Sequence, residues 1–141
     1  MLRLLVATDG SDNAARATQH VLALQRRGVE VRAVVCNVQP PVMSGEVGAV
    51  APIAIAERKR SLAAAAATAA ARAPLEAAGV PVAVHEASGD PAEEICAAAQ
   101  AHECDAIVIG RRGLGALASL VLGSVSAQVV RRASIPVVLV P

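Results

Sequence analysis

The chain has 141 residues, of which 55% are hydrophobic and 18% charged, with 13 basic and 12 acidic side chains and a formal net charge of +1. This length fits one domain, expected to span residues 1–141, and the hydrophobic content excludes a disordered chain. The balanced charge excludes a basic field for nucleic acid or an anionic membrane, and no apolar run reaches the roughly 20 residues that cross a bilayer.

The N-terminus and the cysteines indicate the compartment. The chain opens on an apolar run and turns acidic at Asp9, unlike a secretory signal, so a cytoplasmic location is expected. The three cysteines are odd in number, form no Cys-x-x-Cys pair and are predicted to be buried free thiols: Cys36, Cys96 and Cys104. The three histidines lie in separate predicted elements, so neither a shared metal site nor a catalytic base is expected: His20, His85 and His102.

The first third of the chain predicts two strands around one helix. The run from Arg3 to Ala7 is apolar after its first residue, as a strand buried on both faces should be. Apolar residues then recur at helical spacing from Ala14 to Leu24, and Gly28 marks the end of that helix. The β-branched stretch from Val29 to Val38 predicts a second strand, and prolines and glycines predict a loop from Pro40 to Gly48.

The middle of the chain predicts a long helix, a strand and a shorter helix. An alanine-rich segment from about Ile53 to Ala73 has strong helix propensity, and Pro74 should kink or end it. Val80 to Glu86 is the third predicted strand. Asp90-Pro91-Ala92-Glu93 then supplies an N-cap, a proline at the first helical position and a glutamate at the third, and this helix should run to about His102.

The last third completes the alternation of strands and helices. Ala106 to Ile109 is a short buried strand, a glycine-rich stretch and a helix follow to Ala133, and Pro136 to Val140 is a fifth strand. This βαβαβαβαβ pattern predicts an α/β fold, a single doubly wound, five-stranded parallel sheet with helices on both faces. Ligands of such sheets bind at the carboxyl ends of strands where the order reverses, so the loops after the first and fourth strands form the candidate site.

A glycine pattern follows the fourth predicted strand. Gly110, Gly113 and Gly123-Ser124 form the spacing G-x2-G-x9-G-S before a helix. Glycines let backbone amides approach a phosphate, and a helix N-terminus offers free N–H donors and a positive dipole end. The alternative is that the glycines shape a turn and Ser124 caps the helix. Neither the dinucleotide motif nor a P-loop fits, because the first should follow the first strand and the second needs a lysine, whereas Lys59 is the only lysine.

A carboxylate stands at the end of the first predicted strand, in Ala7-Thr8-Asp9-Gly10-Ser11. There Asp9 can accept hydrogen bonds from ribose hydroxyls. The alternative is that Asp9 caps the first helix, a role that Ser11 or Asp12 would fill equally well. Because the chain has no aromatic residue, an adenine ring would lie against aliphatic groups and backbone.

Four segments together resemble the universal stress protein family, and the resemblance covers essentially the whole chain. They are Val6-Ala7-Thr8-Asp9-Gly10-Ser11, Gly89-Asp90-Pro91, the G-x2-G-x9-G-S loop and Ser134-Ile135-Pro136-Val137-Val138-Leu139-Val140. They occur in the family's order and at its usual separations, and the glycine loop has the form seen in members that bind ATP. The resemblance implies a Rossmann-like sheet with strand order 3-2-1-4-5 and an ATP-binding role in the stress response.

The resemblance also implies a set of site residues. Asp9 would hold the ribose, Val38 would meet adenine through its backbone, and Ala7 and Thr8 would line the pocket. The residues around the ribose and phosphates would be Gly110, Arg112, Gly113, Gly123, Ser124, Val125 and Ser126. Arg111 departs from the family, which usually has a small hydroxyl residue there, and it is expected to point to solvent. The expected ligand is ATP with Mg²⁺.

Three functions compete for this pattern. The leading one is a regulatory module whose conformation or partner choice depends on bound ATP. An enzyme that hydrolyses ATP slowly or uses it is the second, although no catalytic residue set accompanies the loop. The third is a nucleotide-independent dimeric interaction protein, against which the intact glycine loop argues. A homodimer through the strand Val137 to Val140, apolar on both faces at an expected sheet edge, is predicted in the leading case, and no client protein is implied.

Overall fold

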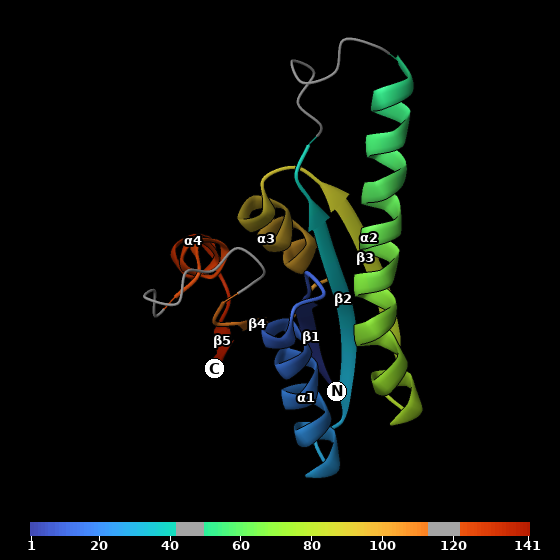
Figure 1. Cartoon of the computed structure of the whole chain (residues 1–141). Coiled ribbons are helices and arrows are strands. Elements are labelled where there is room, and N and C mark those ends of the chain that lie inside the picture. The colour runs from blue at the N-terminus through green and yellow to red at the C-terminus, as the bar shows by residue number, and fades with distance from the viewer. Residues whose placement is uncertain (42–49, 113–121) are drawn as a thin grey trace.

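The computed structural model describes residues 1–41, 50–112 and 122–141, and strands alternate with helices along the chain (Figure 1). The elements, in chain order, are β1 (Leu2–Ala7), α1 (Asp12–Arg26), β2 (Val31–Gln39), α2 (Val50–Ala77), β3 (Val82–Ser88), α3 (Pro91–Ala101), β4 (Ala106–Gly110), α4 (Ser124–Arg132) and β5 (Val137–Val140). The predicted elements are therefore all present, with ends that differ by a few residues. Within the described ranges, no helix is long and apolar enough to cross a membrane.

The strands form one parallel sheet in the order β3-β2-β1-β4-β5, as predicted. In register, Ala7 at the end of β1 pairs with Cys36 of β2, and Val6 pairs with Val108 of β4. From β1 the chain continues to β2 and β3 on one side of β1 in the sheet, whereas β4 and β5 lie on its other side. The order therefore reverses between β1 and β4, where ligands of such sheets bind.

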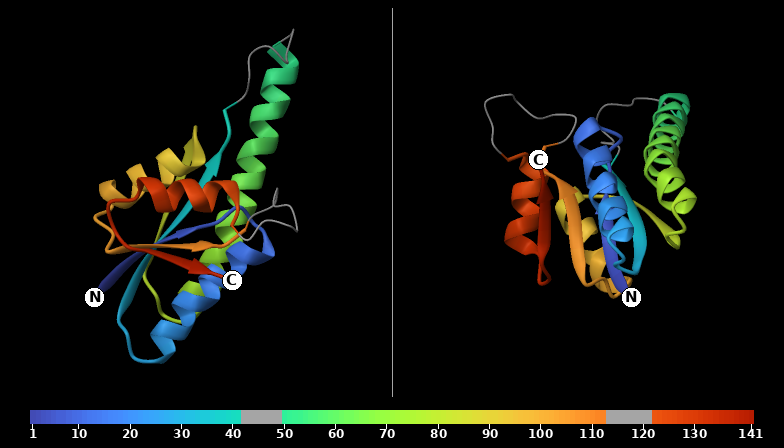
Figure 2. Two further views of the ribbon diagram at one scale, coloured as in Figure 1. Left: turned by 90° about the vertical axis from the view of Figure 1, so that its left-hand side faces the viewer. Right: turned by 90° about the horizontal axis from the view of Figure 1, so that it is seen from below.

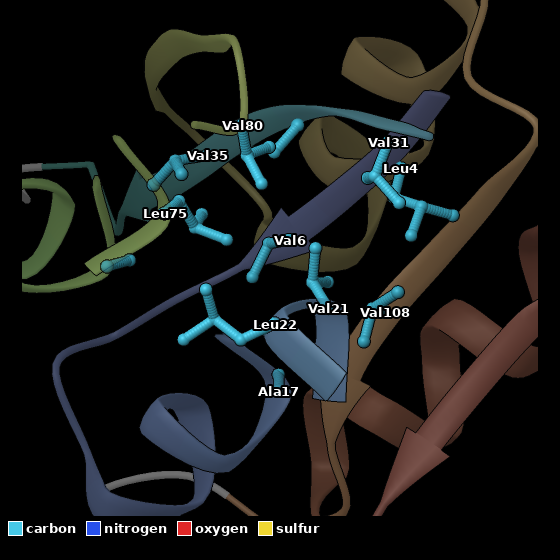
Figure 3. Close-up of a cluster of buried hydrophobic side chains, with 12 residues drawn as sticks. Leu4, Val6, Ala17, Val21, Leu22, Val31, Val35, Leu75, Val80 and Val108 are labelled. Carbon is cyan, nitrogen blue, oxygen red and sulfur yellow. The ribbon is translucent and has the colours of Figure 1, made fainter. Parts of the chain in front are cut away.

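The two faces of the sheet are covered by different pairs of helices, as the view along the strands in Figure 2 shows. Successive side chains of a strand point to opposite faces. On β1, Leu4 and Val6 join a buried cluster with α1 and α2, in which Val21 and Leu75 are fully buried (Figure 3). Leu5 and Ala7 join the second cluster, with α3 and α4. The central strand is thus buried on both faces, as its apolar run predicts.

The helix α2 is longer than predicted and continues through its proline. It begins at Val50 and ends at Ala77, with Pro74 inside its last turns, so of the two predicted effects, a kink or an end of the helix, the end does not occur. Proline lacks the N–H that would bond to the carbonyl four residues earlier. The fully buried Leu75 nevertheless holds this turn against the core. The opposite end of α2 rises beyond the arrowheads of β2 and β3 (Figure 1).

The helix α3 begins as its sequence predicts. Asp90 is the N-cap, its Oδ2 accepts a hydrogen bond from the Glu93 N–H at 3.0 Å, and Pro91 is the first helical residue. Arg132 in the last turn of α4 lies 3.5 Å from Asp90 and 4.0 Å from Glu93. The end of α4 is therefore linked to the start of α3 on the same face of the sheet.

Candidate functional site

The two loops predicted to form the site lie side by side at the reversal of strand order. Residues 8–11 follow β1, and Gly110 ends β4, its neighbour in the sheet, with residues 111–112 after it. Contact between the two segments is close, because a Cβ built on Gly110 would lie 2.6 Å from the main-chain oxygen of Asn13 in the first turn of α1. The fold thus brings together Asp9 and the beginning of the glycine pattern.

The β1–α1 loop holds an exposed carboxylate in a fixed turn. The Asp9 Oδ1 accepts a hydrogen bond from the Ser11 N–H at 2.9 Å, a short-range turn typical of aspartate. Ser11 is the N-cap of α1, since its Oγ accepts from the Ala14 N–H at 3.2 Å. Gly10 between them has φ of +83°, a left-handed conformation that glycine adopts at no steric cost. Ser11, not Asp9, therefore caps the helix, and Asp9 is held at the mouth of the sheet.

The end of β2 presents backbone groups beyond the end of β1. The Cys36 carbonyl accepts from the Thr8 N–H at 2.9 Å, and the Gln39 carbonyl accepts from the Gly89 N–H at 3.0 Å, next to β3. Because backbone groups alternate in direction along a strand, Val38 directs its N–H and C=O to the β1 side, as Cys36 does. In β1 the last residue paired with β2 is Ala7, so Val38 lies past that pairing. This backbone edge is suited to hydrogen-bond a planar ring.

Asn37 is the residue that ends the pairing of β1 with β2, and the sequence interpretation missed it. Its Nδ2 donates to the Thr8 carbonyl at 2.8 Å, the acceptor that the Val38 N–H would use if the parallel ladder continued. Its Oδ1 accepts from the Gln39 Nε2 at 3.0 Å, and the side chain is 1% exposed. An asparagine within the apolar run from Ala33 to Val38 was the signal available in the sequence.

The end of β4 is tied to β5 and to the start of α4. The Arg111 N–H donates to the Val140 carbonyl at 2.8 Å, and the Arg111 carbonyl accepts from the Gly123 N–H at 2.8 Å. The Ser126 Oγ is buried and donates toward the Gly110 carbonyl at 2.8 Å, with the Arg111 carbonyl 3.1 Å away. The Ser126 hydroxyl therefore fixes α4 against the end of β4.

The N-terminus of α4 has no side-chain cap among the described residues. Gly123 is its buried N-cap, and Ser124 is the exposed first helical residue, so the alternative that Ser124 caps the helix is wrong. Val125 follows, half-buried. The first N–H groups of a helix have no partner within it, and they carry the positive end of the helix dipole. This end of α4 can accept an anion.

Two arginines, Arg111 and Arg112, come directly after β4. Arg112 is half-buried. Arg111 is also half-buried, and its Nε is buried with no hydrogen-bond partner among the described residues, which corrects the expectation that it points to solvent. Its backbone bonds to β5 and Gly123 draw it against the molecule. Gly113, the next predicted site residue, lies outside the described residues.

A contact between two histidines was also missed, because they come from separate elements. The His85 Nδ1 on β3 lies 3.2 Å from the His102 Nε2 at the end of α3, with the rings edge to face. One ring can donate to the other in the neutral state. The pair joins the edge strand to α3, away from the reversal of strand order. In the described part of the chain, no three side chains of the metal-binding types come together.

The cysteines are free, as predicted. Cys36 and Cys104 are buried, whereas Cys96 is half-buried, which corrects the prediction that all three are buried. Burial raises the pKa of Cys36 from 9.0 to about 12, and the negative charges of Glu94 and Cys104 add to the shift. Burial likewise raises the pKa of Cys104. Cys36 is thus a neutral thiol that packs under α3.

Comparison with known proteins gives the chain a family. The profile of the universal stress protein family matches residues 1–141. A universal stress protein from Thermus aquaticus, encoded in the QAH/OAS sulfhydrylase 3' region, is 56% identical over 52 residues, which are 37% of this chain and 38% of that relative. The chain thus matches well under half of this curated relative's length.

Two solved structures share the fold over nearly the whole chain. The hypothetical protein MJ0577 is 26% identical, with a TM-score of 0.84 over 99% of this chain and 94% of its own. A universal stress protein crystallised in complex with cAMP is 25% identical, with a TM-score of 0.68 over 99% of this chain and 97% of its own. With the family profile spanning all residues and this shared sheet, the chain belongs to the universal stress protein family.

Proposed function

We propose that this chain is a regulatory nucleotide-binding module of the stress response, which binds ATP with Mg²⁺ where the strand order reverses. One observation carries the proposal. Asp9, the backbone edge of Val38 and the N-terminus of α4 come from three distant parts of the chain and converge around the ends of β1 and β4. They supply an acceptor, a hydrogen-bonding edge and an anion site.

Each of these groups matches one part of a nucleotide. The Asp9 carboxylate, positioned by the Ser11 N–H, accepts from the ribose hydroxyls. The N–H and C=O of Val38 face the adenine edge, and Ala7 and Thr8 line the wall beneath it. The phosphates lie against the first N–H groups of α4. A related protein of the same family was crystallised with cAMP, which shares adenine, ribose and phosphate with ATP.

The phosphate end of the proposed site combines backbone donors with one cation. The residues assigned to it are Gly110, Arg112, Gly113, Gly123, Ser124, Val125 and Ser126. Because the Ser126 hydroxyl bonds to β4, its contribution is the backbone N–H. The Arg112 guanidinium offers charge-assisted hydrogen bonds to phosphate oxygens. Bound Mg²⁺ would neutralise part of the remaining phosphate charge.

A homodimer through β5 is proposed with this function. The strand order places β5 at the edge of the sheet, paired on one side with β4. The Pro136 carbonyl accepts from Ile107 of β4, and the Val140 carbonyl accepts from Arg111 just after β4. Val138, between them in the alternation, therefore also faces β4, and the backbone groups of Val137 and Leu139 face outward. Antiparallel pairing with a second copy would satisfy these outward groups and cover Leu139, which is 38% exposed.

The role of Asp9 is tested by comparing ATP with inorganic triphosphate. Asp9→Ala should weaken ATP binding about tenfold, the order of a lost hydrogen bond to a charged group, and should leave triphosphate binding unchanged or slightly stronger. Asp12→Ala is the matched control, since it removes a neighbouring exposed carboxylate from the first turn of α1. Calorimetric titration of the three proteins decides the point. Equal weakening of both ligands by Asp9→Ala, or equal effects of the two variants, would exclude a ribose contact.

A further inference from the structure

A threonine of α1 breaks the rule that buried hydroxyls are hydrogen-bonded. Thr18 is 2% exposed, and its Oγ1 has no hydrogen-bond partner among the residues that the structure describes. Threonine in a helix ordinarily donates to a carbonyl three or four residues earlier. Thr68 of α2 does so, since its Oγ1 lies 2.9 Å from the Ala64 carbonyl and 3.2 Å from the Ala65 carbonyl. Thr18 forgoes the same bond although it is equally buried.

A small pocket, partly open to solvent, adjoins Thr18 and the β1–α1 loop. Its volume is about 40 Å³, and its lining residues are Thr8, Gly10, Ser11, Ala15, Thr18, Ala70 and Ala71. This space is too small for an adenine ring, but it exceeds the roughly 10–15 Å³ that one water molecule needs. The pocket therefore has room for a water molecule.

Two more hydroxyls on the pocket wall have a proton to donate. The Thr8 Oγ1 accepts from the Gly10 N–H at 3.3 Å, and the Ser11 Oγ accepts from the Ala14 N–H at 3.2 Å. A hydroxyl that accepts a hydrogen bond still has its own O–H available. With Thr18, three hydroxyl residues from the loop and from the second turn of α1 surround one space. Buried waters typically make about three such hydrogen bonds.

We propose that an ordered water molecule occupies this pocket, hydrogen-bonded to the Thr18 Oγ1 and to the hydroxyl of Thr8 or Ser11. The water links the β1–α1 loop to the body of α1, and it satisfies the one buried hydroxyl that the helix leaves unpaired. The loop is then fixed by two sets of hydrogen bonds, those to the water and the one between Ser11 N–H and Asp9 within its own turn. This inference stands independently of nucleotide binding, because the unpaired hydroxyl that carries it belongs to Thr18, which is not among the residues assigned to the nucleotide.

The substitution Thr18→Val changes stability in opposite directions, depending on whether the pocket holds a water molecule. Valine has nearly the same shape as threonine but no hydroxyl. If water is bound, the substitution strands it, and the unfolding equilibrium constant should rise about fivefold to tenfold. If the pocket is dry, removal of an unpaired buried hydroxyl should lower that constant. Thr68→Val is the matched control, since its hydroxyl has protein partners in the structure and its loss should destabilise in either case.

The experiment combines urea unfolding with amide exchange and a crystal structure of the nucleotide-free protein. Thr18→Val should raise the unfolding constant and speed exchange at Gly10 and Ser11 more than at the core amides of β1, and Thr18→Ser should retain slow exchange at both. A neutral or stabilising Thr18→Val would overturn the proposal. So would a high-resolution map of the wild-type protein with no water within hydrogen-bonding distance of the Thr18 Oγ1, and this holds even if the variants fail to fold.

Discussion

The replacement Gly110→Ala tests why a glycine stands at the end of β4. A Cβ at this position would lie 2.6 Å from the main-chain oxygen of Asn13, 2.8 Å from its carbonyl carbon and 3.1 Å from its Cβ. Real Cβ atoms keep at least about 3.0–3.4 Å from such neighbours, so the end of β4 and the first turn of α1 must separate by about half an ångström. The two closest atoms belong to the backbone, and no side-chain rotation relieves them.

The cost follows from opposing contributions. Overpacking against a rigid neighbour costs about 3 kcal/mol, and the loss of glycine's freedom in the unfolded chain returns about 0.5–1 kcal/mol. The free energy of unfolding should therefore fall by about 2 kcal/mol. With a urea dependence of about 2 kcal/mol per molar, the midpoint of unfolding should drop by about 1 M. Circular dichroism during a urea titration measures this shift.

Two comparisons separate the clash from general effects of replacing glycine. Gly28→Asn should stay within about 0.5 kcal/mol of the wild type, because Gly28 has φ of +87° with no atom near its would-be Cβ, and asparagine tolerates that conformation. Asn13→Ala should not rescue Gly110→Ala, since it leaves the backbone oxygen and carbon in place. A neutral Gly110→Ala, or its rescue by Asn13→Ala, would refute the packing argument.

Three further predictions concern pH, assembly and turnover. Above pH 9 the Cys36 thiol ionises in the unfolded chain, whereas in the folded chain it keeps its proton up to about pH 12. The free energy of unfolding should therefore fall as the pH rises, by about 1.4 kcal/mol at pH 10. Cys36→Ala should show a shallower alkaline decline in urea midpoints, and an unchanged one would contradict the buried, neutral thiol. Leu139→Pro should give a folded monomer in sedimentation, because the Leu139 N–H that it removes faces the free edge of β5. Val138→Pro should also destabilise the subunit, because it breaks a hydrogen bond to β4. A wild-type protein that is monomeric at high concentration would contradict the proposed dimer. ATP turnover should remain far below the enzyme median of about 10 per second in a phosphate-release assay, since the only lysine is Lys59 on α2 and no catalytic set accompanies the glycine loop.

The fold was predictable because local signals and the global architecture agree. The apolar run of β1, the cap formed by Asp90 with Pro91 after it, and the β-branched runs of β2 and β5 each indicate the element that forms there. Their alternation then admits few topologies. Pro74 shows the limit of local signals, because the helix continues past this proline, where Leu75 is fully buried, to Ala77.

The site was predictable in its location but not in its contacts. Alternation of strands and helices places the ends of β1 and β4 together, and this placement needs no side-chain detail. The roles of Asn37, of the Gly110 contact with Asn13 and of the His85–His102 pair depend on residues far apart in sequence that meet only in the folded chain. The sequence also left the choice between Asp9 and Ser11 as the cap of α1 open, because both residue types favour the N-cap, and the hydrogen bond from the Ala14 N–H decides it.

Calorimetric titration of the purified wild-type protein with ATP and Mg²⁺ tests the central proposal most directly. The proposal predicts saturable binding of one nucleotide per chain, and loss of that binding in a Gly123→Val protein that circular dichroism shows to be folded, because a side chain there stands in the approach to the first N–H groups of α4. A wild-type protein that is folded and free of bound nucleotide but binds none of ATP, AMP and cAMP would contradict the proposed function.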